Sequence, residues 1–177
     1  LGSGVAAQEK PPLPKAVVEL IEKAKAGDAE AQFSLAGRYR YGLAVVQNDK
    51  EAVKWYRKAA EQGNAKAQSS LGTMYEWGRG VLEDDKEAVK WYRKAAEQGN
   101  ANGQLYLGAM YANGEGVLED SVMAYAWYNI AGANRNSIAR EDKSKLAKRM
   151  TKEQIAEAQK ISRTLYDEIE KRTSKGK

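Results

Sequence analysis

The chain has 177 residues, of which 42% are hydrophobic and 30% charged, a balance typical of folded globular or solenoid proteins rather than disordered chains. Neither cysteine nor histidine occurs, which excludes disulfides and a cysteine nucleophile and removes the commonest general base and metal ligand. The formal charge is +5, and no apolar run approaches the roughly 20 residues that a membrane span needs.

The N-terminal segment, residues 1–14, holds all three prolines and is predicted to be a flexible leader. Val5-Ala6-Ala7 provides the small residues that a signal peptidase prefers. The segment therefore fits the retained end of a signal sequence, or equally a cloning scar joined to a linker. The first interpretation predicts a periplasmic or secreted protein, and a cytoplasmic location is the alternative.

A repeat occupies most of the remaining chain. The segment DKEAVKWYRKAAEQGNA occurs at residues 49–65 and again at 85–101, an unbroken match at an offset of 36. This register defines units 29–64, 65–100 and 101–136, and residues 15–28 match the second half of a further unit. The columns shared by the three units are Leu35, Leu71 and Leu107; Tyr39, Tyr75 and Tyr111; Trp55, Trp91 and Trp127; and Tyr56, Tyr92 and Tyr128. Such a period predicts a solenoid of stacked supersecondary units.

Each unit is predicted to be a helix hairpin. In the unit 65–100, Asn64 caps the first helix and Asp84 opens the second. Apolar and small residues fall on one stripe of each helix, and Gly80 keeps the connection tight. Val81 and Leu82 are expected to fill the gap between the two helices. One hairpin cannot cover its own apolar stripe, so the units must stack.

The C-terminal part, residues 137–172, is predicted to be a helical cap, followed by a disordered tail at 173–177. Thr151 and Gln154 form a T-x-x-Q capping box, and the helix after it is expected to cover the exposed end of the last hairpin. Residues 133–177 contain 13 Lys and Arg against 7 Asp and Glu. This basic region is either a solvated helix face or a contact for an acidic partner.

The unit pattern A-x-A-x-x-x-L-G-x-x-Y-x-x-G-x-G-V, followed by D-x-x-x-A-x-x-W-Y-x-x-A-A-x-x-G-N, resembles the SEL-one-like repeat, a relative of the tetratricopeptide repeat. The resemblance covers about residues 16–136 and implies a right-handed, all-α solenoid of helix hairpins. Ala44 replaces a loop glycine of the first unit, and Ser121 and Arg135 depart from the pattern in the third. The last two departures suggest that the array ends soon after, with altered geometry.

The resemblance also implies that the first helix of each unit lines a concave groove. The predicted partner-binding residues are Phe33, Arg40, Tyr41, Lys66, Thr73, Glu76, Trp77, Asn102, Leu105, Tyr106 and Asn113. These positions vary between units, as expected of a binding groove or of an unconstrained surface. Trp77 lies outside the framework column, so it is either a binding hot spot or a residue packed on the neighbouring loop. Arg40 and Glu76 are one unit apart and are placed to pair.

These patterns predict a non-enzymatic scaffold, adaptor or regulator that binds a protein or peptide in the groove, with no catalytic, metal or cofactor residues. A monomer is expected, with no nucleic-acid partner and no membrane span. One alternative is a binder of glycan or peptidoglycan fragments that uses Tyr41, Trp77 and Tyr106 as stacking platforms. A carboxylate-dependent hydrolase is the other, but its candidate acids, Glu83, Asp84 and Asp85, lie where helix capping already explains them.

Overall fold

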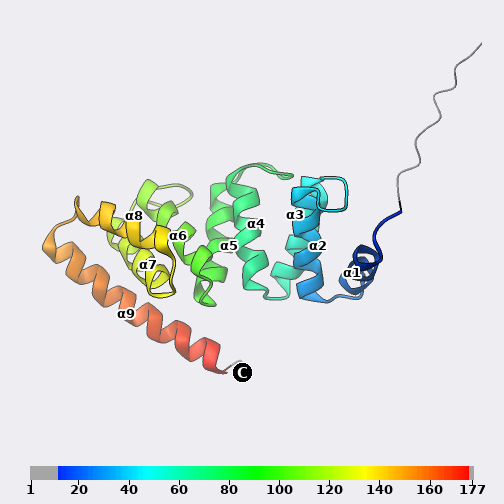
Figure 1. Cartoon of the computed structure of the whole chain (residues 1–177). Helices are drawn as coiled ribbons and strands as arrows, with labels where there is room; N and C mark the ends of the chain where they lie inside the picture. Colours follow the sequence, from blue (N-terminus) through cyan, green and yellow to red (C-terminus); the bar gives the residue numbers. More distant parts are fainter. Residues whose placement is uncertain (1–11, 176–177) are drawn as a thin grey trace, which may run out of the picture.

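The computed structural model describes residues 12–175, and within that range it contains nine α-helices and no strand. In chain order they are α1 (Lys15–Lys25), α2 (Ala29–Tyr41), α3 (Asp49–Glu61), α4 (Ala65–Glu76), α5 (Asp85–Glu97), α6 (Ala101–Asn113), α7 (Ser121–Ala133), α8 (Ser137–Ala147) and α9 (Lys152–Lys175). They form an elongated array, and α9 runs below the end that holds α6, α7 and α8 (Figure 1). The predicted all-α solenoid is confirmed. The predictions for residues 1–11 and 176–177 lie outside the described residues.

Each repeat unit contributes two helices, which we call A and B. The A helices are α2, α4, α6 and α8, and the B helices are α1, α3, α5 and α7. Asn64 Oδ1 accepts a hydrogen bond from the Ala67 N–H at 2.9 Å, and Asp84 Oδ1 accepts one from the Glu87 N–H at 3.0 Å. The helices α2, α3, α6, α7 and α8 are capped in the same way by the residue that precedes each of them. In order, these caps are Asp28, Asn48, Asn100, Asp120 and Asn136. Since each cap typically contributes about 1 kcal/mol, these residues fix where every hairpin helix starts.

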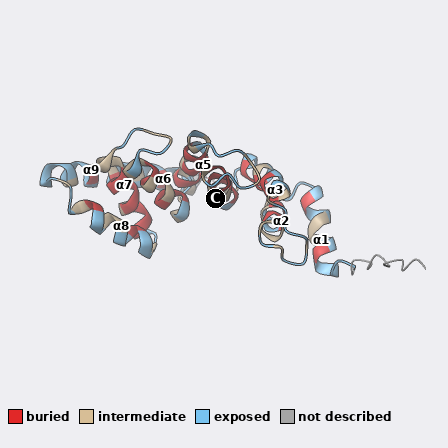
Figure 2. Ribbon diagram, turned by 90° about the horizontal axis from the view of Figure 1, so that it is seen from above, coloured by how far each residue is buried: buried red, intermediate tan, exposed pale blue. Residues whose placement is uncertain are grey.

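Small residues on the A helices let the B helices approach closely. A Cβ atom placed on Gly72 would lie 2.6 Å from the Tyr92 ring, so no larger residue fits there without movement. The framework tryptophans are also buried (Trp55, Trp91 and Trp127). Figure 2 shows the buried residues concentrated where the helices face one another, with exposed residues on the outer turns. The recurring columns of the sequence are therefore core positions, as predicted.

A ladder of buried amide side chains joins successive units, and the sequence analysis missed it. Gln68 is only 4% exposed. Its Nε2 donates to the Ala60 carbonyl at 3.0 Å, and its Oε1 accepts from Gln98 Nε2 at 2.6 Å. Gln32 and Gln104 make the equivalent pairs of bonds in the neighbouring units. Because Ala60 belongs to the B helix of the preceding unit, each rung fixes the distance between two units.

The loop between the A and B helices packs against the start of the preceding B helix. Gly80 has a φ of +70°, and a Cβ atom there would lie 2.3 Å from the carbonyl carbon and oxygen of Asp49. Ala44 takes the same position in the first unit, with a φ of +61°. A cavity of about 1000 Å³, lined by residues 12–14 and Ala44, lies at that position. This space accommodates the methyl group that the second unit has no room for.

One loop prediction is wrong. Val81 packs against the core, but Leu82 is 88% exposed and fills no gap between helices. Leu118, its equivalent in the third unit, is 90% exposed. A single apolar residue closes the hairpin because the glycine before it already brings the loop onto the preceding helix.

The array continues one helix beyond the repeat seen in the sequence. α8 packs on α7 as an A helix, and Arg140 Nε donates to the Gly132 carbonyl at 2.9 Å, as the ladder glutamines do in earlier units. Arg135 takes a φ of +66°, in the same left-handed region as Gly99 at the equivalent turn, where φ is +81°. This turn therefore keeps the backbone conformation of the earlier units, and the array ends one helix later, at α8.

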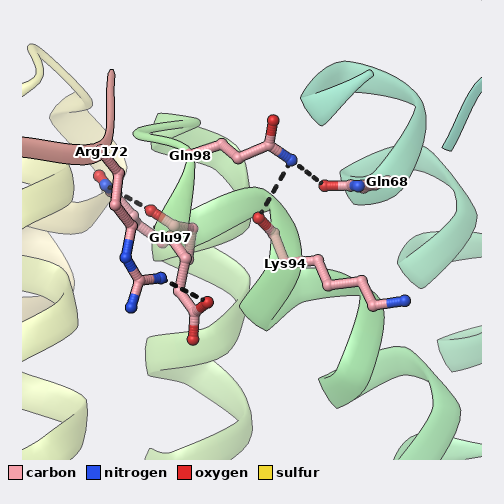
Figure 3. A network of polar contacts seen from close by, with 7 residues as sticks. Gln68, Lys94, Glu97, Gln98 and Arg172 are labelled. Carbon is pink, nitrogen blue, oxygen red and sulfur yellow. Dashed lines mark hydrogen bonds and ion pairs between the residues drawn. The ribbon is translucent and has the colours of Figure 1, made fainter. Parts of the chain in front are cut away.

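α9 starts as predicted and extends further along the array than the last unit. The Thr151 N–H donates to Gln154 Oε1 at 2.9 Å, and the Gln154 N–H donates to Thr151 Oγ1 at 3.2 Å, which confirms the capping box. The helix lies on α7, the second helix of the last repeat unit, and also reaches α5, where Arg172 Nη1 lies 2.9 Å from Glu97 Oε2 (Figure 3). It also continues to Lys175, through residues expected to be disordered.

The composition of α7 explains where α9 docks. Ile130 and Ala133 stand where α5 carries Lys94 and Glu97. Ile130 is buried in the same hydrophobic cluster as Ile169, with Leu165 packed against it. Burying these aliphatic side chains stabilises the contact between α7 and α9. The equivalent positions of α5 are charged, and there α9 forms the ion pair between Arg172 and Glu97.

Candidate functional site

The A helices carry exposed residues at repeating positions, and we call the surface that these residues form the A face. It is defined by the exposed residues Glu30, Tyr41, Lys66, Trp77, Asn102 and Asn113. Tyr41 and Trp77 occupy equivalent positions at the ends of α2 and α4 and are 61% and 63% exposed. Neither belongs to a hydrophobic core cluster. Two large aromatic side chains, one unit apart, are thus available to a partner.

The other predicted groove residues lie deeper. Phe33, Arg40, Thr73, Glu76 and Tyr106 are half-buried. The ring of Tyr106 lies 5.1 Å from that of Tyr92, so it is partly used by the core. Leu105 is only 6% exposed and packs with Leu146 of α8. Its inclusion among the accessible groove residues was wrong, because α8 packs against this part of α6 and nothing in the repeat pattern predicts that contact.

Arg40 and Glu76 do not pair with each other among residues 12–175. Each instead lies beside a tyrosine on the B helix of the same unit: Arg40 beside Tyr56 and Glu76 beside Tyr92. Burial raises the pKa of Tyr56, and the Arg40 guanidinium beside it opposes that shift. Tyr92 donates a hydrogen bond from its hydroxyl to Glu76 Oε2. Burial raises the pKa of Glu76, and this hydrogen bond from Tyr92 opposes the rise.

A cavity of about 450 Å³ opens on the A face between the first two units. Its walls include Phe33, Tyr41 and Tyr56, together with Arg38 and Ser70. Aromatic rings with a few polar groups are typical of a surface that receives a side chain of a bound peptide.

A second cavity, of about 390 Å³, lies near the other end of the A face, and sequence reasoning did not identify it. It is lined by Ala112, Asn113 and Tyr128, and by residues of α8 and the turn after it. The available signal was the column Arg40, Glu76 and Ala112, in which the third unit alone carries a short side chain.

Of the carboxylates considered for catalysis, Asp84 caps α5 and Asp85 is the first residue of that helix. Across residues 12–175, no three potential ligands come close enough together to hold a metal ion. In the same range, no helix combines the length and apolar character that crossing a membrane requires.

Comparison with known families decides the classification. A family model described as Sel1 repeat matches residues 29–64, 65–100 and 101–136, the same unit boundaries as in the sequence. The chain belongs to the Sel1 repeat family. Sel1 repeat proteins commonly act as scaffolds for protein interactions and are generally non-catalytic.

Solved Sel1 structures share this architecture. A protective antigen of uropathogenic Escherichia coli with an SLR fold is 36% identical, with a TM-score of 0.82 over 87% of this chain. The present chain covers 33% of that antigen, about a third of its length. A Sel1 repeat protein from Oxalobacter formigenes is 41% identical, with a TM-score of 0.68, and the match covers 75% of this chain and 99% of that one.

A more distant structure, cysteine rich protein B of Helicobacter pylori, is 24% identical, with a TM-score of 0.57 over 73% of this chain and 92% of that one. At this identity the likeness concerns the fold alone. A comparison with curated protein sequences finds no match.

Proposed function

We propose that the A face binds a segment of a partner protein and that the chain acts as an adaptor or regulator without catalysis. The observation that supports this most directly is the exposure of Tyr41 and Trp77, which are 61% and 63% exposed at equivalent positions of adjacent units. The cavity between the first two units lies beside Tyr41. Together they offer two aromatic anchors and one recess, which suits a peptide that crosses the units.

The expected contribution of these rings is large. Aromatic side chains bury about 150–250 Å² each, so covering the exposed part of each ring removes on the order of 100 Å² from water. At about 25 cal/mol per Å², that corresponds to roughly 2–3 kcal/mol for each ring. Contributions of this size are typical of hot spots in protein interfaces.

A glycan ligand is the second candidate, because exposed tyrosine and tryptophan rings also stack on sugars. Of the three platforms predicted, Tyr41 and Trp77 are exposed, whereas Tyr106 is half-buried against Tyr92. Two exposed rings and a recess fit a peptide better than a row of three sugar-binding platforms.

The test begins with peptides selected from a display library on the whole immobilised chain. The double variant Tyr41→Ala, Trp77→Ala should weaken their binding by at least about thirtyfold, the effect of losing a hot spot of about 2 kcal/mol. The control is Leu82→Ala with Leu118→Ala, which removes leucines 88% and 90% exposed in the loops. Equal losses in the two double variants would count against the A face.

The glycan alternative uses Trp77 as an intrinsic probe. Trp77 is 63% exposed, whereas the other three tryptophans are at most 7% exposed, so acrylamide quenching of the emission reports mainly on the A face. Selected peptides should protect Trp77 from acrylamide, and muropeptide fragments should not. Protection by muropeptides alone would favour the glycan-binding function.

A further inference from the structure

The cavity of about 450 Å³ on the A face has one charged side chain in its lining, and that side chain is a cation. Arg38 supplies it, and no carboxylate is among the residues that line the cavity. The other polar side chains of the lining are hydroxyls, which donate hydrogen bonds as well as accept them: Ser34, Tyr41, Tyr56 and Ser70. The walls therefore provide hydrogen-bond donors and positive charge without a fixed negative charge.

Arg38 differs from its equivalents in the other units. Met74 and Met110 occupy the same column of the repeat, and both are at most 1% exposed in the hydrophobic core. Arg38 is instead half-buried and lines the cavity. Since two of the three units fill this column with an apolar core residue, the repeat framework does not require a cation there.

The guanidinium of Arg38 has few partners within the chain. Among residues 12–175, the one hydrogen bond of this side chain runs from Nη1 to the Leu43 carbonyl, at 3.3 Å. In the same range Arg38 forms no ion pair with a carboxylate. Because a guanidinium has five N–H donors, most of them remain available to a ligand in the cavity.

A second guanidinium makes this end of the A face positive. The Cζ atom of Arg40 lies 5.2 Å from the centre of the Tyr41 ring, and its Nε is buried without a hydrogen-bond partner in the described part of the chain. Burial raises the pKa of Tyr56, and Arg40 opposes that rise. Burial also raises the pKa of the equivalent Tyr92 and Tyr128, but there neighbouring carboxylates add to the rise. The charge beside this tyrosine is thus positive only in the first unit.

We propose that this cavity binds an acidic side chain, Asp or Glu, of the partner segment, with Arg38 as its main contact. The guanidinium donates to the carboxylate in the planar geometry that suits this pair, and the Arg40 charge adds attraction. Because the proposed segment crosses the units between Tyr41 and Trp77, the carboxylate belongs to a side chain rather than to the end of a chain. This inference rests on the proposed function of the A face and adds the chemical class of one recognised side chain.

The experiment measures binding of a tetraglutamate peptide, blocked at both ends, to the whole chain by calorimetry. Blocked tetraglutamine and tetralysine are measured beside it. Tetraglutamate should bind at least about tenfold more tightly than tetraglutamine, the effect of one charge-assisted hydrogen-bonded pair, and the difference should shrink in high salt. Equal or tighter binding of tetraglutamine or tetralysine would overturn the proposal.

A fourth peptide tests the other source of a carboxylate. Tetraglutamine with a free C-terminus carries a single carboxylate at its end and none on its side chains. It should bind no better than the blocked tetraglutamine. If it binds as tightly as blocked tetraglutamate, the assignment to an acidic side chain is wrong.

Two variants of Arg38 locate the site. Arg38→Met gives the first unit the residue that the other two units carry, and should weaken tetraglutamate binding at least about tenfold. Arg38→Lys keeps the charge without the planar guanidinium and should give a smaller loss. The matched control is Arg163→Met, the same replacement at an exposed position of α9, which should leave binding unchanged. Thermal melting checks that each variant folds, and Arg38→Lys serves as the test if Arg38→Met does not.

Equal losses in Arg38→Met and Arg163→Met would refute this site, since they would reflect the general attraction of an acidic peptide to a chain of formal charge +5. The selected peptides of the preceding test distinguish that failure from failure of the A face itself. If they still require Tyr41 and Trp77, the A face functions without a carboxylate subsite.

Discussion

Replacing Gly80 by alanine should separate the first two units more than any exposed substitution does. Gly80 has a φ of +70°, and its new Cβ atom would lie 2.3 Å from the Asp49 carbonyl carbon and oxygen and 2.8 Å from the Lys50 nitrogen. These neighbours are backbone atoms at the start of α3, so no side chain can rotate away. The loop or the whole unit must shift instead.

The magnitude follows from two costs. A left-handed conformation costs a residue with a Cβ atom roughly 1–2 kcal/mol. Forcing extra volume into a packed contact typically costs a further 1–3 kcal/mol. Gly80→Ala should therefore lower the free energy of unfolding by about 2–5 kcal/mol, out of about 5–15 kcal/mol for a typical domain. For a chain of this length, the midpoint of thermal unfolding should fall by about 5–15 °C.

The matched control is Ala44→Gly, at the equivalent position of the first unit. Ala44 already has a φ of +61°, and a cavity of about 1000 Å³ lies beside it. Removing its methyl group relieves the left-handed strain but adds roughly 0.5–1 kcal/mol of freedom to the unfolded chain. The net change in the free energy of unfolding should lie between zero and a gain of about 1.5 kcal/mol.

Thermal melts and urea titrations followed by circular dichroism measure both variants. Hydrogen exchange adds the location, since Gly80→Ala should speed exchange mainly at the start of α3 and in the loop before α5. A loss below about 1 kcal/mol for Gly80→Ala, or equal effects of the two variants, would show that the close approach to Asp49 does not hold these units together.

Three further outcomes are expected. Gln68→Leu removes the amide group that hydrogen-bonds both to Ala60 and to Gln98, and should lower the free energy of unfolding by about 2–3 kcal/mol in urea titrations. An unchanged free energy of unfolding would mean that the ladder does not stabilise the fold. Arg172→Ala breaks an exposed ion pair with Glu97 and should cost at most about 1 kcal/mol, an effect that should vanish in high salt. Because burial raises the pKa of Glu76 above its ordinary 4.5, the folded chain holds that proton more tightly than the unfolded chain. Stability should therefore fall as the pH rises through this range, and Glu76→Gln, compared with wild type in urea titrations between pH 4 and 7, should flatten the dependence.

Much of the fold could be predicted from the sequence because its determinants are local. Caps such as Asn64 and Asp84 act on amides three residues away, and the Thr151–Gln154 box closes within one turn. The period of 36 residues then makes every unit a copy of its neighbour. Local signals repeated three times leave little freedom in where the helices begin and how they pair.

The candidate site was harder to predict, because accessibility depends on helices far apart in the sequence. Trp77 is exposed, but Leu105 is buried by α8, which carries none of the repeat pattern. The buried glutamines looked like ordinary surface residues, since the carbonyl that each one bonds lies on the B helix before its own unit. Arg40 and Glu76 suggested a surface ion pair, and only the packing shows that each lies beside a tyrosine.

By itself, then, the sequence determined the hairpin, its length, its caps and the columns that must be buried, because these depend on helical periodicity and on contacts within a few turns. The tertiary structure alone decided the course of α9 over α7, the ladder between units and the open position beside Tyr128. Each of these depends on which side chains meet across units and how closely. The linear order of residues does not fix those distances until the helices have packed.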